Sequence, residues 1–183
     1  MPVRDNIGFL STKNKCLNLL GSVPGEQNFN VSYRSGDSTI ATVSNSFVYS
    51  DNNFAATLTL SFINSNSYGA ILYIDTNDYI DLSNYSTLFI SSYLTINNKN
   101  LSTDTANTLH TASVYLVNEN EAETKISNMT NGDTIIGPHY YDISSYTGKY
   151  KIRFHQDLNN VAYTSAISSK FEGTLTVTCV SLY

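Results

Sequence analysis

The acidic residues of one short segment gather side-chain oxygens that could bind a cation. Asp75, Asp78 and Asp81 follow one another within a single stretch, and carboxylate oxygens are the ligands that Ca²⁺ prefers. The full spacing of an EF-hand loop is missing, and ordinary Asp–Asn turns explain the same residues. We therefore expect at most a structural calcium ion on these three carboxylates, and no other cofactor.

Ring side chains gather beside a proline in a second segment. Pro138 is followed by His139 and Tyr140, and a rigid proline turn could hold these rings as a small ligand-binding patch. The alternative is that Tyr140 and Tyr141 merely start a corner of the chain, since packing is the commoner use of Tyr. Tyr68 and Tyr163 fall in expected loops, and Tyr in a loop is typical of recognition surfaces. The predicted ligand-binding residues are thus Tyr68, His139, Tyr140 and Tyr163.

No motif marks a catalytic centre. The three histidines, His110, His139 and His155, lie far apart and lack the spacing of zinc ligands. The sequence contains neither a G-x-S-x-G elbow nor a phosphate-binding glycine loop, and no carboxylate pair stands out. We expect a non-enzymatic protein, with His155 at the surface or edge of a strand.

Charge and hydropathy exclude two classes of partner. The net charge is -5, and the ten Lys and Arg residues are spread along the chain, the tightest group being Lys149, Lys151 and Arg153. Nucleic-acid binding normally requires a concentrated basic face, so we do not expect it. No apolar run approaches the ~20 residues of a membrane helix, and the N-terminus has no apolar signal-peptide region.

The two cysteines, Cys16 and Cys179, lie near opposite ends of the sequence. They could form a disulfide if the termini meet, because chain ends are often close together. Two buried free thiols are the other interpretation.

The pattern of apolar residues divides the chain in two. Residues 1–28 are expected to form an N-terminal arm or linker, with a short helix over 13–20 ended by Gly21 and Pro24. From residue 29 apolar and polar residues alternate, which predicts strands with one buried face. Strands are expected at 29–33, 38–43, 46–50, 56–62, 70–74, 87–96, 112–117, 134–136, 149–155 and 175–180. Many short strands indicate an all-β antiparallel sandwich over residues 29–183.

One short pattern occurs twice. The segment 79–85 reads Tyr-Ile-Asp-Leu-Ser-Asn-Tyr, and the segment 140–146 reads Tyr-Tyr-Asp-Ile-Ser-Ser-Tyr. Asp and Ser can close side-chain-to-backbone turns, and the apolar residue between them can fill the core. Each copy precedes an expected strand, so the pattern predicts two matching corners. A chance likeness in a chain rich in Tyr and Ser is the alternative.

The second copy and the strand after it resemble a segment of galactose-binding-like jelly rolls. These modules occur as carbohydrate-binding domains and on bacteriophage tail fibres and baseplates, and the resemblance covers roughly residues 35–183. It implies a jelly-roll sandwich, with glycan binding as one use. The tryptophan that such modules usually place under a sugar is missing, since the chain contains no Trp.

A low-charge chain rich in Ser, Thr, Asn and Tyr is also similar to phage structural proteins. This implies a non-enzymatic bacteriophage virion structural or attachment protein, a tail, fibre or capsid-surface component assembled in the bacterial host cytoplasm. It would be a homo-oligomer, contact other virion proteins through residues 1–28 and recognise a cell-surface glycan. The alternative is a stand-alone bacterial carbohydrate-binding module or a small glycan-active enzyme.

Overall fold

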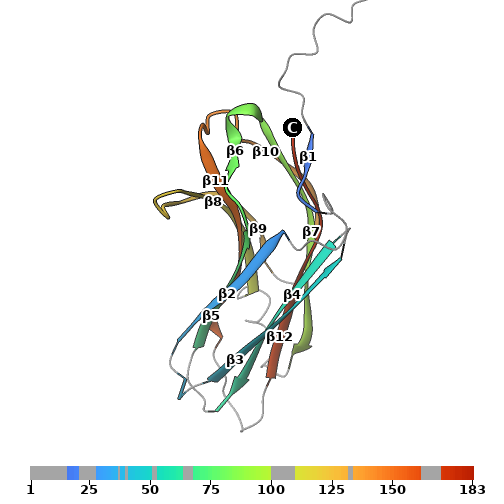
Figure 1. Ribbon diagram of the computed structural model, residues 1–183. Coiled ribbons are helices and arrows are strands. Elements are labelled where there is room, and N and C mark those ends of the chain that lie inside the picture. The colour runs from blue at the N-terminus through green and yellow to red at the C-terminus, as the bar shows by residue number, and fades with distance from the viewer. Residues whose placement is uncertain are drawn as a thin grey trace, which may run out of the picture.

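The chain folds into two antiparallel β-sheets that pack face to face (Figure 1). The computed structural model describes residues 16–20, 28–36, 38–39, 41–50, 53–63, 68–99, 110–131, 134–161 and 170–183. The expected all-β jelly-roll sandwich is confirmed. In the described part of the chain, no helix is long and apolar enough to cross a membrane.

Sheet A has the strand order β10-β7-β12-β4-β3, and β1 pairs with the end of β12. Its strands are β1 (Leu17–Asn18), β3 (Ala41–Ser50), β4 (Asn53–Phe62), β7 (Thr87–Lys99), β10 (Thr134–Asp142) and β12 (Lys170–Leu182). The strands expected at 38–43 and 46–50 become one strand, β3, which begins at Ala41 and pairs with β4 without interruption. Ser38 and Thr39 form a turn instead.

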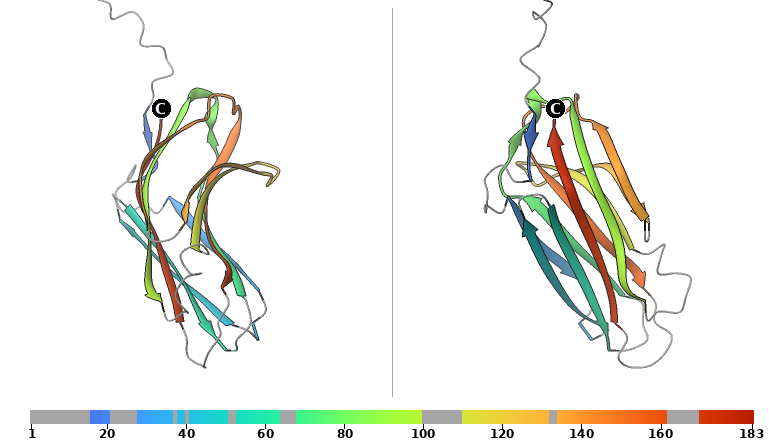
Figure 2. Two further views of the ribbon diagram at one scale, coloured as in Figure 1. Left: turned by 180° about the vertical axis from the view of Figure 1, so that it is seen from behind. Right: turned by 90° about the vertical axis from the view of Figure 1, so that its right-hand side faces the viewer.

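Sheet B has the strand order β2-β5-β11-β8-β9, and the short strand β6 pairs with the start of β11. Its strands are β2 (Phe29–Ser35), β5 (Tyr68–Thr76), β6 (Ile80–Asp81), β8 (His110–Asn118), β9 (Glu123–Asn131) and β11 (Lys149–Val161). The tip of the β8–β9 hairpin bends away from the sandwich on the sheet B side, which Figures 1 and 2 both show.

Three phenylalanines join the two layers at the centre of the core. Phe54 comes from sheet A, and its ring centroid lies 4.9 Å from that of Phe29 and 5.6 Å from that of Phe154, both on sheet B. All three side chains are fully buried. Tilted and edge-on ring pairs at these distances add to the free energy gained from burying the rings.

The repeated pattern forms the two corners that the sequence predicts. Asp81 Oδ1 accepts a hydrogen bond from Ser83 N at 3.0 Å, and Asp142 Oδ1 accepts one from Ser144 N at 2.9 Å. The residue that follows each aspartate is fully buried, Leu82 in a short 3-10 helix (Leu82–Asn84) and Ile143 in the second corner. The first corner carries the chain from sheet B to sheet A, and the second carries it back.

The two corners also bind each other. Leu82 N donates to Gly148 O at 2.9 Å, and Ile143 N donates to Ser86 O at 2.9 Å. Gly148 N donates to Ser83 Oγ at 3.0 Å. Gly148 has a φ of +95°, a conformation that suits glycine because it has no Cβ. The corners lie at the same end of the sandwich as β1 and the C-terminus (Figure 1).

The expected helix over 13–20 is wrong for the residues that the structure describes. Leu17 and Asn18 form β1, which pairs with Leu182 and Ser181 of β12. Leu19 and Leu20 turn into the core, where both are buried. Pairing with the last strand and burial of two leucines outweigh the weak local preference for a helix. Residues 16–20 therefore belong to the sandwich.

Candidate functional site

The outer face of sheet B carries a group of interacting polar and aromatic side chains. Ile152 and Phe154 of β11 are buried in the core, so alternation turns Arg153, His155 and Asp157 to the opposite side. The strand register places Asp75 and Tyr115 beside Arg153. We call the following residues the outer-face cluster: Tyr73, Asp75, Tyr115, Glu123, Lys125, Arg153, His155 and Asp157.

Arg153 holds the cluster together. Its Nε and Nη2 donate to the two carboxylate oxygens of Asp75 at 2.7 and 2.6 Å, and its Nη1 donates to Glu123 Oε1 at 2.6 Å. The guanidinium carbon lies 5.2 Å from the ring centroid of Tyr73. Hydrogen bonds to Asp75 raise the pKa of Arg153 further above its usual range. This planar fork fixes two carboxylates from β5 and β9 in one rigid array.

His155 lies between two tyrosines. The Tyr115 ring stacks on the imidazole at 4.0 Å between centroids, and the Tyr73 ring meets it edge-on at 4.7 Å. The expected surface position of His155 is wrong, because its neighbours leave the residue only 6% exposed. Burial lowers the pKa of His155, which favours the neutral imidazole. Its Nε2 lies 3.7 Å from Glu123 Oε2 and forms no hydrogen bond in the described structure.

Asp157 adds a carboxylate at low exposure. Its Oδ1 is buried and has no hydrogen-bond partner in the described structure. Burial raises the pKa of Asp157, and burial together with the Asp157 charge raises the pKa of Tyr115. Lys125 lies over the Tyr115 ring at 5.7 Å. One end of the cluster is thus a charged fork, and the other holds aromatic rings beside a partly buried carboxylate near Lys125.

The β8–β9 hairpin tip stands next to this cluster. Tyr79 Oη donates to Glu121 Oε1 at 2.8 Å, and Lys151 lies over the Tyr79 ring at 5.0 Å. Lys149 and Glu119 form a weaker, exposed ion pair at 4.0 Å. The hairpin tip is therefore tied to the start of β11. The tip projects from the sheet B side of the sandwich (Figures 1 and 2).

The arrangement is suited to binding a neutral polyhydroxylated ligand. Tyrosine rings offer flat apolar faces with a polar group at one end. Arginine and carboxylate side chains offer paired donors and acceptors held in fixed planes. A sugar presents the same combination, an apolar ring face edged by hydroxyl groups.

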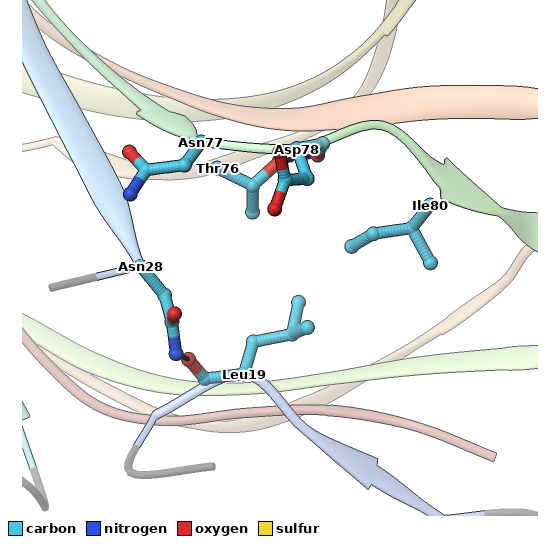
Figure 3. A pocket seen from close by; sticks show the side chains of 6 residues that line it. All are labelled: Leu19, Asn28, Thr76, Asn77, Asp78 and Ile80. Atoms are coloured by element: carbon cyan, nitrogen blue, oxygen red, sulfur yellow. Dashed lines mark hydrogen bonds between the residues drawn. The ribbon is translucent and has the colours of Figure 1, made fainter. Parts of the chain in front are cut away.

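A separate small pocket opens at the corner end of the sandwich (Figure 3). Its volume is about 170 Å³, below the roughly 300–1,000 Å³ of typical ligand pockets. The side chains of Asn28 and Asn77 form one side, and Asp78 points in from above (Figure 3). Its lining residues are Leu19, Asn28, Thr76, Asn77, Asp78 and Ile80.

Hydrogen bonds fix the frame of this pocket. Asn28 Nδ2 donates to Leu19 O at 3.1 Å, and Thr76 Oγ1 donates to Asp78 O at 3.1 Å. Thr76 Oγ1 also accepts from Ile152 N at 3.2 Å. The pocket has room for a small polar molecule rather than for an oligosaccharide.

The three aspartates of the expected calcium site do not come together. Both oxygens of Asp75 bind Arg153, Asp81 Oδ1 caps the first corner, and Asp78 lines the small pocket. Across the residues that the structure describes, no group of three or more His, Cys, Asp or Glu side chains could hold a metal ion. Strand alternation and the corner send the three side chains in different directions.

The predicted ligand-binding residues are also dispersed. His139 and Tyr140 lie on β10, where Tyr140 is 70% exposed and its ring centroid lies 4.8 Å from that of Phe89 on the outer face of sheet A. Tyr68 begins β5, but its side chain lies outside the described structure. Tyr163 lies outside the described residues altogether. Their role in binding stays a prediction.

Sequence reasoning missed the outer-face cluster because its members come from four strands. A faint signal was present, since Arg153, His155 and Asp157 are polar residues at every second position of a strand. That pattern identifies a solvent-facing side. It does not reveal that Asp75, Tyr115 and Glu123 lie opposite.

Comparison with known proteins identifies similar structures only. No family model matches the sequence, and no curated protein matches it. A CBM29-2 mutant complexed with cellulohexaose is 8% identical, with a TM-score of 0.45 over 92% of this chain and 89% of that chain. TmCBM27, a module with specific mannan recognition, is 13% identical, with a TM-score of 0.44 over 92% and 94%.

A third similar structure is the family 11 carbohydrate-binding module of a cellulosomal cellulase from Clostridium thermocellum. It is 13% identical, with a TM-score of 0.41 over 92% of both chains.

Proposed function

We propose that this chain is a non-enzymatic carbohydrate-binding module whose ligand lies on the outer face of sheet B. One observation carries the proposal: Arg153 locks Asp75 and Glu123 beside Tyr73 and Tyr115 on a solvent-facing sheet. Such a preformed array lowers the entropy cost of ordering side chains when a ligand binds. The tip of the β8–β9 hairpin projects on the same side of the molecule as this face (Figures 1 and 2).

The aromatic rings supply most of the expected affinity. Binding energy usually concentrates in a few aromatic and arginine side chains. We expect Tyr73→Ala and Tyr115→Ala each to weaken glycan binding at least tenfold, which corresponds to about 1.4 kcal/mol. Tyr140→Ala is the matched control, because Tyr140 is an exposed tyrosine on the opposite sheet.

The test is calorimetric titration of the protein and its three variants. The first probes are cellulohexaose and mannan oligosaccharides, followed by an array of microbial and plant glycans. Loss of binding with Tyr73→Ala and Tyr115→Ala, but not with Tyr140→Ala, supports the site. Loss with Tyr140→Ala alone moves the site to β10 of sheet A, which carries two of the four residues predicted from the sequence, His139 and Tyr140. Absence of binding to every glycan on the array rejects the proposal.

The bacteriophage attachment role stays a prediction. It requires the same glycan recognition and adds assembly with other virion proteins through residues 1–28. The carbohydrate-binding module needs only the site described above, so it is the simpler conclusion.

A further inference from the structure

The four outermost strands of the two sheets differ in whether their open edges are protected against pairing with another chain. Unpaired N–H and C=O groups on an edge strand can pair with another chain, and proteins usually block this with charges, prolines or bulges. The edge strands here are β3 and β10 of sheet A and β2 and β9 of sheet B.

Three of these edges carry such protection. β10 contains Pro138, and its pairing with β7 shifts between Ile136 and His139. β9 carries the charged Glu123 and Lys125, and its pairing with β8 shifts twice. β2 is shorter and carries Arg34. Each feature hinders the addition of another strand.

β3 has none of these features. Its ten residues, Ala41–Ser50, include no charged residue, proline or glycine, and they pair with β4 in one unbroken register. No described strand pairs with its other side. β3 is therefore a long, regular and uncharged edge.

The side chains of β3 also leave apolar surface uncovered at this edge. Val43 and Phe47 pack against the core but stay only partly buried. Val48, on the outer face, is 64% exposed. A strand added beside β3 would cover part of these side chains, which favours association through the hydrophobic effect.

We propose that two copies of this chain pair through β3, antiparallel about a twofold axis, so that their A sheets become one continuous sheet. Identical strands meet in such an interface, so any charge on β3 would face a like charge near the axis. The chain has a net charge of -5, yet β3 has none. A second copy is therefore the partner that this edge fits.

The pairing register follows from the side chains. With Asn45 on the axis, Phe47 of one copy lies beside Val43 of the other on the core side. Ser46 then lies beside Ser44, and Val48 beside Thr42, on the outer side. This register keeps apolar side chains together and pairs nearly the whole strand. The outer-face cluster belongs to sheet B and stays accessible in both copies.

The first experiment places lysines on the edge. Ser44 and Ser46 are exposed, so the S44K/S46K variant should leave the single chain folded. Light scattering should give twice the 20.2 kDa chain mass for the natural protein and the single mass for the variant. The control S32K/S35K adds the same charge to exposed positions of β2 and should remain a dimer.

Variants with the opposite charge at the same two positions distinguish loss of pairing from loss of folding. S44E/S46E should also be a monomer, because Glu then faces Glu across the axis. An equimolar mixture of the Lys and Glu variants should recover the double mass, since Ser46 of one copy faces Ser44 of the other. A monomeric natural protein, a dimeric S44K/S46K variant or a mixture that stays monomeric would each overturn the proposal.

Discussion

Arg153 is the single residue on which the polar structure of sheet B depends most. It makes three hydrogen bonds to two carboxylates, and its side chain is only 16% exposed. A lysine at this position carries the same charge but cannot reproduce the planar fork. The geometry of the guanidinium, rather than its charge alone, is therefore what the cluster uses.

The substitution Arg153→Lys should destabilise the fold. We expect the free energy of unfolding to fall by about 1–3 kcal/mol, because at least one charge-assisted hydrogen bond and the bidentate geometry are lost. Chemical denaturation measures this change. Lys149→Ala, which removes an exposed ion pair, should change it by less than about 0.5 kcal/mol. Equal effects of the two substitutions would contradict the role given to Arg153.

Asp157 makes the stability depend on pH. Burial raises its pKa above the unfolded value, so the folded state binds the proton more tightly. The stability that protonated Asp157 contributes is fully present below its pKa in the unfolded chain. This contribution is lost as the pH rises through the pKa of Asp157 in the folded state. Asp157→Asn removes this loss, so we expect it to raise the melting temperature near pH 7.5 by about 2–4 °C.

The gain from Asp157→Asn should shrink as the pH is lowered, because the natural carboxyl then takes up a proton. His155 works in the other direction: its lowered pKa costs stability as the pH falls below the unfolded histidine value. Both proteins contain His155, so the difference between their melting curves from pH 4 to pH 8 isolates Asp157. A gain that is constant with pH would show that the carboxyl is not perturbed.

At the scale of elements, the two corners were the most predictable feature. Each is closed by an aspartate and the backbone two residues later, and each inserts one apolar residue into the core. These interactions are local, so a short sequence pattern contains all of them. β1 could not be predicted in the same way, because its partner strand lies at the other end of the chain.

The buried residue of each corner should contribute more to the free energy of unfolding than the exposed residues do. Ile143→Ala and Leu82→Ala each remove a fully buried side chain, and we expect losses of about 2–5 kcal/mol in the free energy of unfolding. Ser145→Ala, at an exposed position of the second corner, is the control and should stay within about 0.5 kcal/mol. Similar losses from all three substitutions would mean that Leu82 and Ile143 do not stabilise the fold by filling the core.

At the scale of the whole molecule, alternating apolar residues were enough to predict a sandwich. They identify which side of each strand is buried, and the core phenylalanines follow that alternation. The order of the strands could not be predicted from the sequence, because it depends on which distant strands pair. The outer-face cluster depends on the same pairing, so the fold class was predictable while the candidate site was not.

The pairing of β1 with β12 places the two cysteines at the same end of the sandwich, but too far apart to form a disulfide. Leu17 pairs with Leu182, so Cys16 lies beside Tyr183, four residues beyond Cys179. Four strand residues span about 13 Å, well above the roughly 7 Å limit for a disulfide. Both cysteines are free in the structure. Partial burial and the neighbouring Cys16 thiol raise the pKa of the Tyr183 hydroxyl.

This register predicts where a disulfide would form. In a Cys179→Ser background, Tyr183→Cys should cross-link to Cys16 under mild oxidation, because paired residues on antiparallel strands lie about 4.5–5.5 Å apart. The bond would close almost the whole chain into one loop and could add about 5 kcal/mol on a chain-entropy estimate. Intact mass and melting temperature measure both effects. A disulfide between Cys16 and Cys179 in the natural chain would instead require β1 to slide by four residues, which would pull Leu19 and Leu20 out of their places in the core.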